Sequence, residues 1–257
     1  MVKVAFFDVD GTLVSHTQKA VPQSAKNALD ALARKGILRV LATGRHMLEL
    51  QMLPVAGMEF DGYITMNGQL TLDARGNVIS GSPIVGEDKE ILLRLFREKE
   101  IPIVLVEKDR MYINFINDYV VSAQHAISTP LPEVGEYTGN ELYQAVGYLG
   151  KEQEHILPGL LPGCKATRWN EYGIDIYSAS GGKTAGIRDY LAIQQIPLEE
   201  TIAFGDGEND VDMLKLVHTG VAMGNADDCV KEIADYIAPS VDEDGICRAL
   251  QALGVIE

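Results

Sequence analysis

The sequence predicts an α/β protein with a core of parallel strands and helices, into which a smaller α+β domain is inserted. Towards both ends of the chain, short apolar strands alternate with amphipathic helices, an order typical of a parallel sheet. In the middle, strands follow one another across short turns, which is typical of antiparallel pairs. We therefore expect the core at residues 1–82 and 180–257 and the inserted α+β domain at residues 83–179.

The first part of the core begins with a βαβ unit. Val4–Phe7 is a run of four apolar residues, Ser24–Lys35 has apolar residues at helical spacing, and Ile37–Ala42 is again apolar. A strand, a helix and a strand in this order give a parallel pair with a right-handed crossover. Further elements are expected as a helix at His46–Leu53, a strand at Gly62–Thr65 and a hairpin of Gln69–Asp73 with Asn77–Ser82.

The inserted domain starts with an amphipathic helix at Glu87–Lys99, which has apolar residues on one side and charges elsewhere. A loop rich in Pro and Gly occupies Thr129–Gly139. Strands are expected at Pro102–Glu107, Met111–Ile116, Leu142–Leu149, Lys165–Trp169 and Gly173–Tyr177, with one helix ending near His125 and another at Glu152–Leu157.

The alternating pattern returns in the second part of the core. Asn225 is expected to cap one of its helices, because Asn is a favoured N-cap residue. Helices are expected at Lys183–Ala192, Val211–Val217, Asp227–Ala234 and Gly245–Leu253, and strands at Thr201–Phe204, Gly220–Ala222 and Tyr236–Ala238.

The charge balance argues against two classes of protein. The 257 residues include 22 basic and 37 acidic side chains, a formal net charge of −15. A general binder of nucleic acid or of anionic membranes would normally carry the opposite balance. If the substrate is an anion, a metal ion or a few basic side chains must supply positive charge at the site.

The cysteines and the apolar runs indicate the compartment. Cys164, Cys229 and Cys247 are widely spaced and form no Cys-x-x-Cys pair, which argues against a disulfide scaffold or a thiolate zinc site. Asp8 comes too early for a secretory signal, and the apolar run Ile101–Val106 is far too short to span a bilayer. We expect a cytoplasmic protein.

Asp8 and Asp10 follow the first strand, one residue apart. Side chains at this spacing share a face of a strand, so both can converge on one small volume. Carboxylates crowded beside a core are costly unless they hold a proton or a metal ion. A plain Asp-Gly turn after a strand is the structural alternative, and this segment alone does not decide between the two.

Polar residues also follow the other strands expected in the core sheet. The carboxyl ends of parallel strands meet at one edge of the sheet, where ligands bind. Carboxylates that converge there fit Mg²⁺, which prefers oxygen ligands and a phosphate oxygen, while a hydroxyl and a backbone N–H suit an anion. Phosphoryl chemistry is therefore expected. The residues concerned are Thr43, Gly44 and Arg45 after the second strand, Asn67 after the third, Asp206, Asn209 and Asp210 after the strand at Thr201–Phe204, and Lys183 at the start of the preceding helix.

These residues form a known set of motifs. Asp8-x-Asp10-Gly11-Thr12, Thr43-Gly44-Arg45, Lys183 and Gly205-Asp206-x-x-Asn209-Asp210, in this order, resemble the four motifs of the haloacid dehalogenase (HAD) superfamily. The inserted domain resembles the type IIB cap of the Cof-like sugar-phosphatase group. The resemblance covers nearly the whole chain and implies a Rossmann-like parallel-sheet core with an inserted α+β cap.

The resemblance also implies a role for each motif residue. Asp8 would be the nucleophile, forming an aspartyl-phosphate, and would bind Mg²⁺. Asp10 would protonate the leaving oxygen, then deprotonate the hydrolytic water, and would give its backbone carbonyl to the metal. The remaining implied roles are phosphate binding by the Val9 amide, Thr43, Gly44, Lys183 and Asn209, metal binding by Asp206, support of the metal site by Asp210, and substrate contacts by Arg45 and Asn67.

The function predicted in this way is that of a Mg²⁺-dependent phosphatase acting on a small phosphorylated metabolite, such as a sugar phosphate. Neither nucleic acid nor a membrane is expected as a partner. The cap would exclude water and select the leaving group. Two alternatives stay open. A phosphomutase or other phosphotransferase would share the first half-reaction, and a non-catalytic phosphate- or metal-binding module would keep the ligands without needing Asp10.

Overall fold

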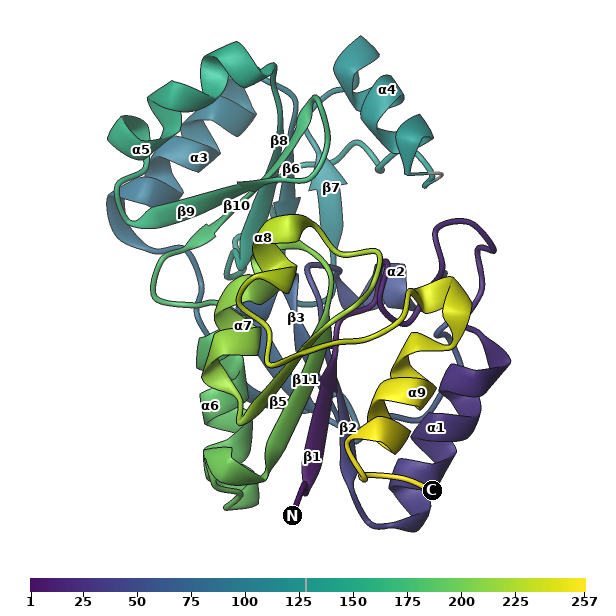
Figure 1. The fold of residues 1–257 in the computed structure, drawn as a ribbon. Coiled ribbons are helices and arrows are strands. Elements are labelled where there is room, and N and C mark those ends of the chain that lie inside the picture. The colour runs from purple at the N-terminus through teal and green to yellow at the C-terminus, as the bar shows by residue number, and fades with distance from the viewer. Residues whose placement is uncertain (128) are drawn as a thin grey trace. The chain divides into compact units, whose positions relative to one another are not determined.

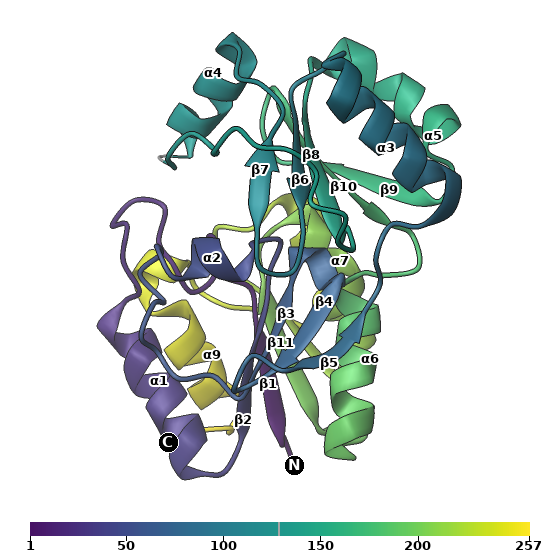
Figure 2. The same cartoon turned by 180° about the vertical axis from the view of Figure 1, so that it is seen from behind.

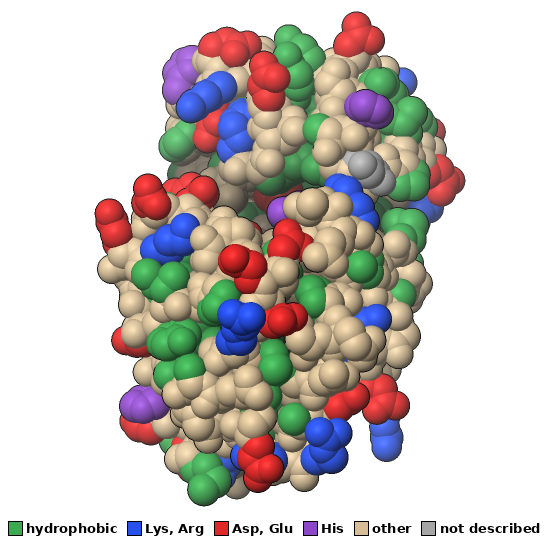
Figure 3. Space-filling view, turned by 45° about the vertical axis from the view of Figure 1, so that its right-hand side comes forward, with side chains coloured by type: hydrophobic (Ala, Val, Ile, Leu, Met, Phe, Trp, Pro, Cys, Tyr) green, Lys and Arg blue, Asp and Glu red, His purple; other side chains and the backbone are tan. Residues whose placement is uncertain are grey.

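The computed structural model describes residues 1–127 and 129–257, which divide into two compact units. Met1–Ser80 and Lys183–Glu257 form the first unit, and Gly81–Gly182 form the second. Each unit has its own sheet and its own apolar core. Acidic and basic side chains are interspersed over the face that Figure 3 shows. Among the residues that the structure describes, no helix has the length and apolar character needed to cross a membrane.

The first unit is built on an eight-stranded sheet with the order β13-β12-β11-β1-β2-β3-β4-β5. Neighbouring strands from β13 to β3 pair in parallel, and β3 and β4 pair antiparallel. The chain runs outward in one direction through β1, β2 and β3, and in the other through β11, β12 and β13, so the strand order reverses between β1 and β11. The strands are β1 (Val4–Phe7), β2 (Leu38–Ala42), β3 (Gly62–Thr65), β4 (Leu70–Asp73), β5 (Val78–Gly81), β11 (Thr201–Gly205), β12 (Thr219–Ala222) and β13 (Tyr236–Ile237).

Helices cover both faces of this sheet, as Figures 1 and 2 show. On one face α1 and α9 pack against Ala5 and Phe7 of β1, and on the other α6, α7 and α8 pack around Val4 and Phe6. Because alternate side chains of a strand point to opposite faces, an apolar run through β1 serves both cores. The helices are α1 (Gln23–Arg34), α2 (Met47–Leu50), α6 (Lys183–Gln194), α7 (Val211–Leu216), α8 (Asp228–Lys231) and α9 (Gly245–Ala252).

The second unit is an α+β fold around a five-stranded sheet with the order β7-β6-β8-β10-β9. All of its strand pairs are antiparallel. Apolar residues of α3 and α5, Leu92, Phe96 and Leu157 among them, join Ile103, Ile174 and the other core residues of the sheet in one cluster. The elements are β6 (Ile103–Val106), β7 (Met111–Ile113), β8 (Gln144–Tyr148), β9 (Cys164–Arg168), β10 (Gly173–Ser178), α3 (Gly86–Glu98), α4 (Asp118–Ala126) and α5 (Leu157–Leu160).

The structure confirms the predicted fold class and corrects some element limits. The helix expected at His46–Leu53 is only α2, Met47–Leu50, and the chain turns before Pro54, since the residue before a proline disfavours helix. The strand expected at Met111–Ile116 ends at Ile113, because the Asn114 side chain accepts hydrogen bonds from the backbone N–H groups of Ile103 and Phe115.

The expected helix cap at Asn225 was wrong. The helix there is α8, it begins at Asp228, and Asp227 occupies its N-cap position. The Asn225 side chain instead donates to the Gly11 carbonyl at 2.8 Å and accepts from the Val241 N–H at 2.9 Å. Its amide therefore joins the loop after β1 to the chain that leads into α9, a long-range contact that no local pattern reveals.

Gly186 sits where α6 packs on the sheet, and it provides a test of this packing. A Cβ at this position would lie 2.6 Å from Ile64 Cγ2 and 2.8 Å from Thr71 Oγ1. Overpacking costs about 1–3 kcal/mol, and Ala in place of Gly within a helix returns at most about 1 kcal/mol. We expect Gly186→Ala to lower the free energy of unfolding by about 1–2 kcal/mol in chemical denaturation.

The matched control is Gly159→Ala in α5, where a Cβ meets no atom within 4 Å. This substitution should leave stability unchanged or slightly raise it. A Gly186→Ala variant as stable as the wild type would contradict the close approach of α6 to β3 and β4.

Candidate active site

The residues singled out in the sequence lie in the first unit, at the carboxyl ends of four neighbouring strands. Asp8 directly follows β1, Thr43 follows β2, and Asn67 lies just beyond β3. Asp206 directly follows β11, and Lys183 is the first residue of α6. The four strands lie in the order β11-β1-β2-β3, so the reversal of strand order falls inside this group, where open parallel sheets bind their ligands.

Lys183 joins two carboxylates in the interior. Its Nζ donates to Asp8 Oδ1 at 2.7 Å and to Asp210 Oδ1 at 2.6 Å, and the three side chains are between 1% and 9% exposed. Burial opposes the charge on Lys183, but Asp210 and Asp8 outweigh it and raise its pKa. Lys183 is therefore a buried counter-ion to Asp8 and Asp210.

Asp210 also shapes the turn that follows β11. Its Oδ2 accepts the backbone N–H groups of Asp206 and Gly207, each at 3.0 Å. A Cβ at Gly205 would lie 2.6 Å from the Asp210 Cβ, so only glycine leaves room for this turn. Both oxygens of Asp210 are thus in use, and one of them holds the backbone N–H of Asp206; the supporting role expected for Asp210 at a metal site stays a prediction.

Asp206 is packed against the loop after β1. Its Oδ1 accepts the Thr12 hydroxyl at 2.7 Å. Gly11 has a φ of +81°, and a Cβ there would lie 2.1 Å from Asp206 Oδ2. Burial, reinforced by the charges of Asp210 and Asp10, raises the pKa of Asp206 from 3.8 to about 7, although the Thr12 hydrogen bond works in the opposite direction.

The acidic groups fit a hard divalent cation. One carboxylate oxygen from each of Asp8, Asp206 and Asp210 lies within 4.8 Å of the other two. Burial, with the neighbouring carboxylates, also raises the pKa of Asp8 in spite of Lys183. One lysine does not balance three carboxylates, and oxygen donors of this kind are those that Mg²⁺ prefers. The donor set is therefore suited to a metal ion.

The carboxylate of Asp10 is engaged elsewhere. Arg45 Nε donates to Asp10 Oδ2 at 2.9 Å and Arg45 Nη2 donates to Asp10 Oδ1 at 3.0 Å, while Arg45 Nη1 donates to Glu49 at 3.1 Å. Burial opposes the charge on Arg45, but Asp10 and Glu49 outweigh it and raise its pKa. Asp10 was expected to offer its backbone carbonyl to the metal. The pairing with Arg45 uses only the side chain of Asp10, so it does not engage that carbonyl. The substrate contact expected of Arg45 stays a prediction.

The expected phosphate ligands lie on the loops around this cluster. Asn209 Nδ2 donates to Asn67 Oδ1 at 3.1 Å, which links the loops after β11 and β3. Asn67 has a left-handed backbone, which Asn tolerates, and its side chain lies against Gly44, where a Cβ would be 3.2 Å from Asn67 Oδ1. Thr43 Oγ1 accepts the Arg45 N–H at 3.1 Å. The Val9 N–H has no hydrogen-bond partner among the described residues, so it can meet an anion.

Three contacting residues were not singled out as site residues from the sequence. Thr12 donates to the Asp206 carboxylate, and Asn225 donates to the carbonyl of Gly11, the glycine against which Asp206 packs. No local pattern in the sequence predicts these contacts. Glu49 could have been found, because it stands four residues after Arg45 near the start of a helix, the spacing at which opposite charges pair.

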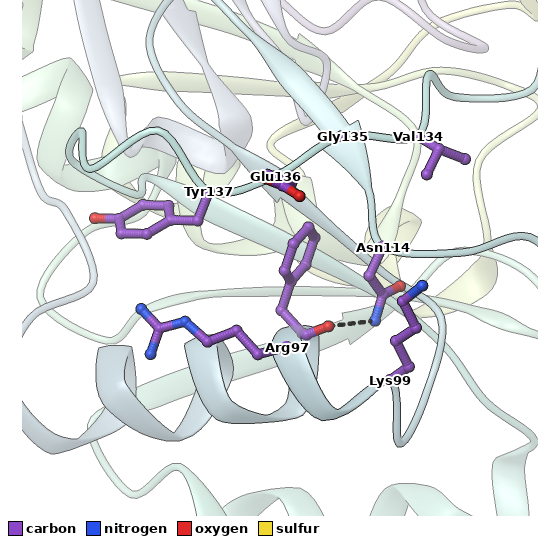
Figure 4. Close-up of a pocket in the computed structure, with 8 residues that line it drawn as sticks. Arg97, Lys99, Asn114, Val134, Gly135, Glu136 and Tyr137 are labelled. Atoms are coloured by element: carbon purple, nitrogen blue, oxygen red, sulfur yellow. Dashed lines mark hydrogen bonds between the residues drawn. The ribbon is translucent and has the colours of Figure 1, made fainter.

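The second unit contains a separate hollow of about 540 Å³, shown in Figure 4. Its buried polar side chain, Asn114, is already fully bonded: Oδ1 accepts two backbone N–H groups, and Nδ2 donates to the carbonyls of Phe96 and Ile101. Asn114 therefore has no hydrogen-bonding group left over for a ligand in this hollow, as far as the described residues show. It is lined by Phe96, Arg97, Lys99, Asn114, Val134, Gly135, Glu136 and Tyr137.

The α/β fold carries carboxylates and a buried lysine at the carboxyl edge of its parallel strands, and comparison with known proteins identifies the family to which such a chain belongs. The model of the haloacid dehalogenase-like hydrolases matches residues 5–250, and the chain belongs to this family. It is a phosphoric monoester hydrolase. The predicted superfamily is thereby confirmed.

Individual relatives match over nearly the whole chain. The Bacillus subtilis protein YkrA is 33% identical over 259 residues, which are 99% of each chain. An HMP-PP phosphatase of Yersinia pseudotuberculosis is 30% identical over 88% of this chain and 85% of its own.

Two solved structures of the superfamily are also similar. BT1666 from Bacteroides thetaiotaomicron, one of the HAD phosphatases, has a TM-score of 0.91 and 33% identity, over 100% of this chain and 96% of its own. The subclass IIB sugar phosphatase BT4131 has a TM-score of 0.87 and 33% identity, over 99% of this chain and 100% of its own.

The raised pKa values of Asp8 and Asp206 predict how the metal-free protein responds to pH. A carboxyl whose pKa is higher in the folded state stabilises the fold below its unfolded value, about 3.9, and loses this contribution as pH rises through the folded value, about 7 for Asp206. In EDTA we therefore expect Asp8 and Asp206 to lower the Tm progressively as the pH rises from 5 to 8. Mg²⁺ should raise the Tm more at pH 8 than at pH 5, because protons compete with it at low pH.

The control is Asp206→Asn, which removes one of the two titrating groups. Thermal unfolding in EDTA should show a flatter dependence on pH for this variant. An equal slope in the variant and the wild type would contradict the assignment to Asp206.

Proposed function

We propose that this phosphatase requires Mg²⁺ and hydrolyses a small phosphorylated metabolite through an aspartyl-phosphate on Asp8. The observation that carries the proposal is the cluster of Asp8, Asp206 and Asp210 around Lys183, at the edge of the sheet where ligands bind. A nucleophilic carboxylate needs a neighbouring positive charge to accept an approaching phosphate dianion. Lys183 and a divalent cation would provide it.

Asp8 and Asp206, with the backbone carbonyl of Asp10, would hold the metal ion. When bound, Mg²⁺ supplies charge neutralisation for these carboxylates and for the phosphate oxygens. Asp210 would act through Asp206, because both of its oxygens are occupied by Lys183 and by backbone N–H groups.

The proposed reaction has two displacements at phosphorus. A carboxylate oxygen of Asp8 forms a bond to phosphorus while the ester P–O bond breaks, and the leaving oxygen takes a proton from Asp10. A water molecule then attacks the aspartyl-phosphate and gives its proton to Asp10. The bond between phosphorus and Asp8 breaks, which releases inorganic phosphate and restores both carboxyl groups.

The phosphate oxygens would be met by donors that the fold already holds in place. An ammonium group has three N–H donors, and Lys183 uses two of them on Asp8 and Asp210. The third, with Asn209, Thr43 and the backbone N–H groups of Val9 and Gly44, is available for phosphate. Donors fixed before the substrate arrives stabilise the transition state without reorganisation.

The substrate class rests on the relatives and on the division of the chain. One relative is an HMP-PP phosphatase and one similar structure is a sugar phosphatase, so we propose a small phosphorylated metabolite. All residues assigned to phosphate and metal lie in the first unit. We propose that the second unit is the cap and selects the leaving group.

Replacement of the nucleophile tests the covalent step. Asp8→Asn should lower the turnover of p-nitrophenyl phosphate at least 10³-fold, because the amide cannot form the acyl phosphate. Release of inorganic phosphate and of nitrophenol should be measured together, with circular dichroism to show that the fold is retained. Asp61→Asn, outside the site, is the matched control and should keep wild-type turnover. Residual activity in Asp8→Asn within tenfold of the wild type would rule out Asp8 as the nucleophile.

Removal of the metal tests the proposed cofactor. EDTA should abolish phosphate release, and Mg²⁺ added in excess of the chelator should restore it, because Asp8 and Asp206 repel the phosphate when no cation is bound. Turnover that continues in EDTA after dialysis would contradict the metal site. Mg²⁺ binding without any phosphate release would instead favour a non-catalytic module.

A further inference from the structure

We propose that Glu49 is a positioning residue for Asp10 and that it acts through Arg45. The inference rests on the proposed function, in which Asp10 passes a proton to the leaving oxygen. Glu49 belongs to none of the four sequence motifs.

Arg45 holds both oxygens of Asp10. Its Nε and Nη2 donate to Oδ2 and Oδ1 at 2.9 and 3.0 Å, so two parallel hydrogen bonds fix the plane of the carboxylate as well as its position. A carboxylate has about four acceptor sites, and this contact uses two. The other two stay available, and one of them can hold the proton that Asp10 donates to the leaving oxygen.

Glu49 holds the far side of the same guanidinium. Its Oε1 accepts Arg45 Nη1 at 3.1 Å, and its Oε2 accepts the backbone N–H of His46 at 2.8 Å. The carboxylate of Glu49 is thus tied to the main chain at the start of α2. Without Glu49, the long Arg45 side chain would have only Asp10 to hold it and could turn together with it.

The backbone of Arg45 is itself fixed. Its N–H donates to Thr43 Oγ1 at 3.1 Å, and its carbonyl accepts the Met66 N–H at 3.1 Å. The side chains of Arg45, Asp10 and Glu49 are 18%, 31% and 22% exposed. An ion pair four residues apart at this exposure contributes little to stability, so the main effect of losing Glu49 should fall on the orientation of Asp10.

A misplaced Asp10 should affect substrates unequally. A sugar or polyol hydroxyl is a poor leaving group and needs a proton as the ester bond breaks, whereas p-nitrophenolate departs without one. Because kcat/KM reports only the steps up to departure of the alcohol, it isolates this requirement. The later use of Asp10 as a base is common to both esters and enters kcat.

The experiment compares Glu49→Gln with the wild type on p-nitrophenyl phosphate and on the sugar or polyol phosphate that the wild type cleaves fastest, with saturating Mg²⁺. Arg45 and His46 donate to different oxygens of Glu49, and in Gln one of these positions is an NH2 group that cannot accept, so one of the two hydrogen bonds is lost. We expect kcat/KM for the alkyl ester to fall about 10- to 100-fold, the size of loss seen when a residue that orients a metal ligand is replaced. For the aryl ester we expect a fall of about threefold or less.

Two further variants separate positioning from a structural role. Arg45→Lys keeps the charge but lacks the paired donors, and it should show the same selective loss on the alkyl ester. Asp61→Asn is the matched control, because Asp61 likewise accepts a backbone N–H and a guanidinium, both from Arg39. It should change neither ester. Thermal unfolding of all variants confirms that they are folded.

The outcomes are distinct. Equal losses on both esters, or an unchanged ratio of the two kcat/KM values in Glu49→Gln or in Arg45→Lys, would overturn the positioning role while leaving the proposed function intact. A wild type that cleaves neither ester in Mg²⁺ would overturn the proposed function itself.

Discussion

Repulsion between like charges governs this site. Asp8, Asp206 and Asp210 place carboxylate oxygens within 4.8 Å of one another at the edge of a hydrophobic core, where Asp8 and Asp210 are buried and Asp206 is partly buried, so water screens their charges less than at the surface. Lys183, with 4% of its surface exposed, is the basic side chain that pairs with Asp8 and Asp210 among the residues that the structure describes. A cation bound among these carboxylates would reduce the repulsion between them.

Small residues make the crowding possible. Asp206 can approach the loop after β1 because Gly11 has no Cβ, and Asp210 can fold back on the turn after β11 because Gly205 has none. Backbone N–H groups and the Thr12 hydroxyl then hold the carboxylates in place. The glycines of the motifs are thus steric requirements of the acidic residues beside them, which explains why motif residues occur as short contiguous strings.

Much of this arrangement could be predicted from the sequence, because it depends on local pattern. The apolar run Val4–Phe7 and the helical spacing in Ser24–Lys35 identify the core, and the rule that strand ends meet at one edge places Asp8 near Asp206. The contacts of Lys183 with Asp210 and of Asn225 with Gly11 depend on side-chain direction in the folded chain, which spacing does not encode. The pairing of Arg45 with Asp10 and Glu49 was likewise not predicted, because a motif does not show which neighbouring carboxylates a flexible guanidinium will contact.

The division of the chain also bears on how such an enzyme can change over time. The second unit has its own sheet and core, and the chain passes between the units only at residues 80/81 and 182/183. The packing around Asp8 and Asp206 is made by residues of the first unit, whereas the core of the second unit is made by its own residues. Related proteins could in this way keep the site residues of the first unit while the sequence of the inserted second unit diverges. New metabolic roles could then arise from changes in the second unit alone.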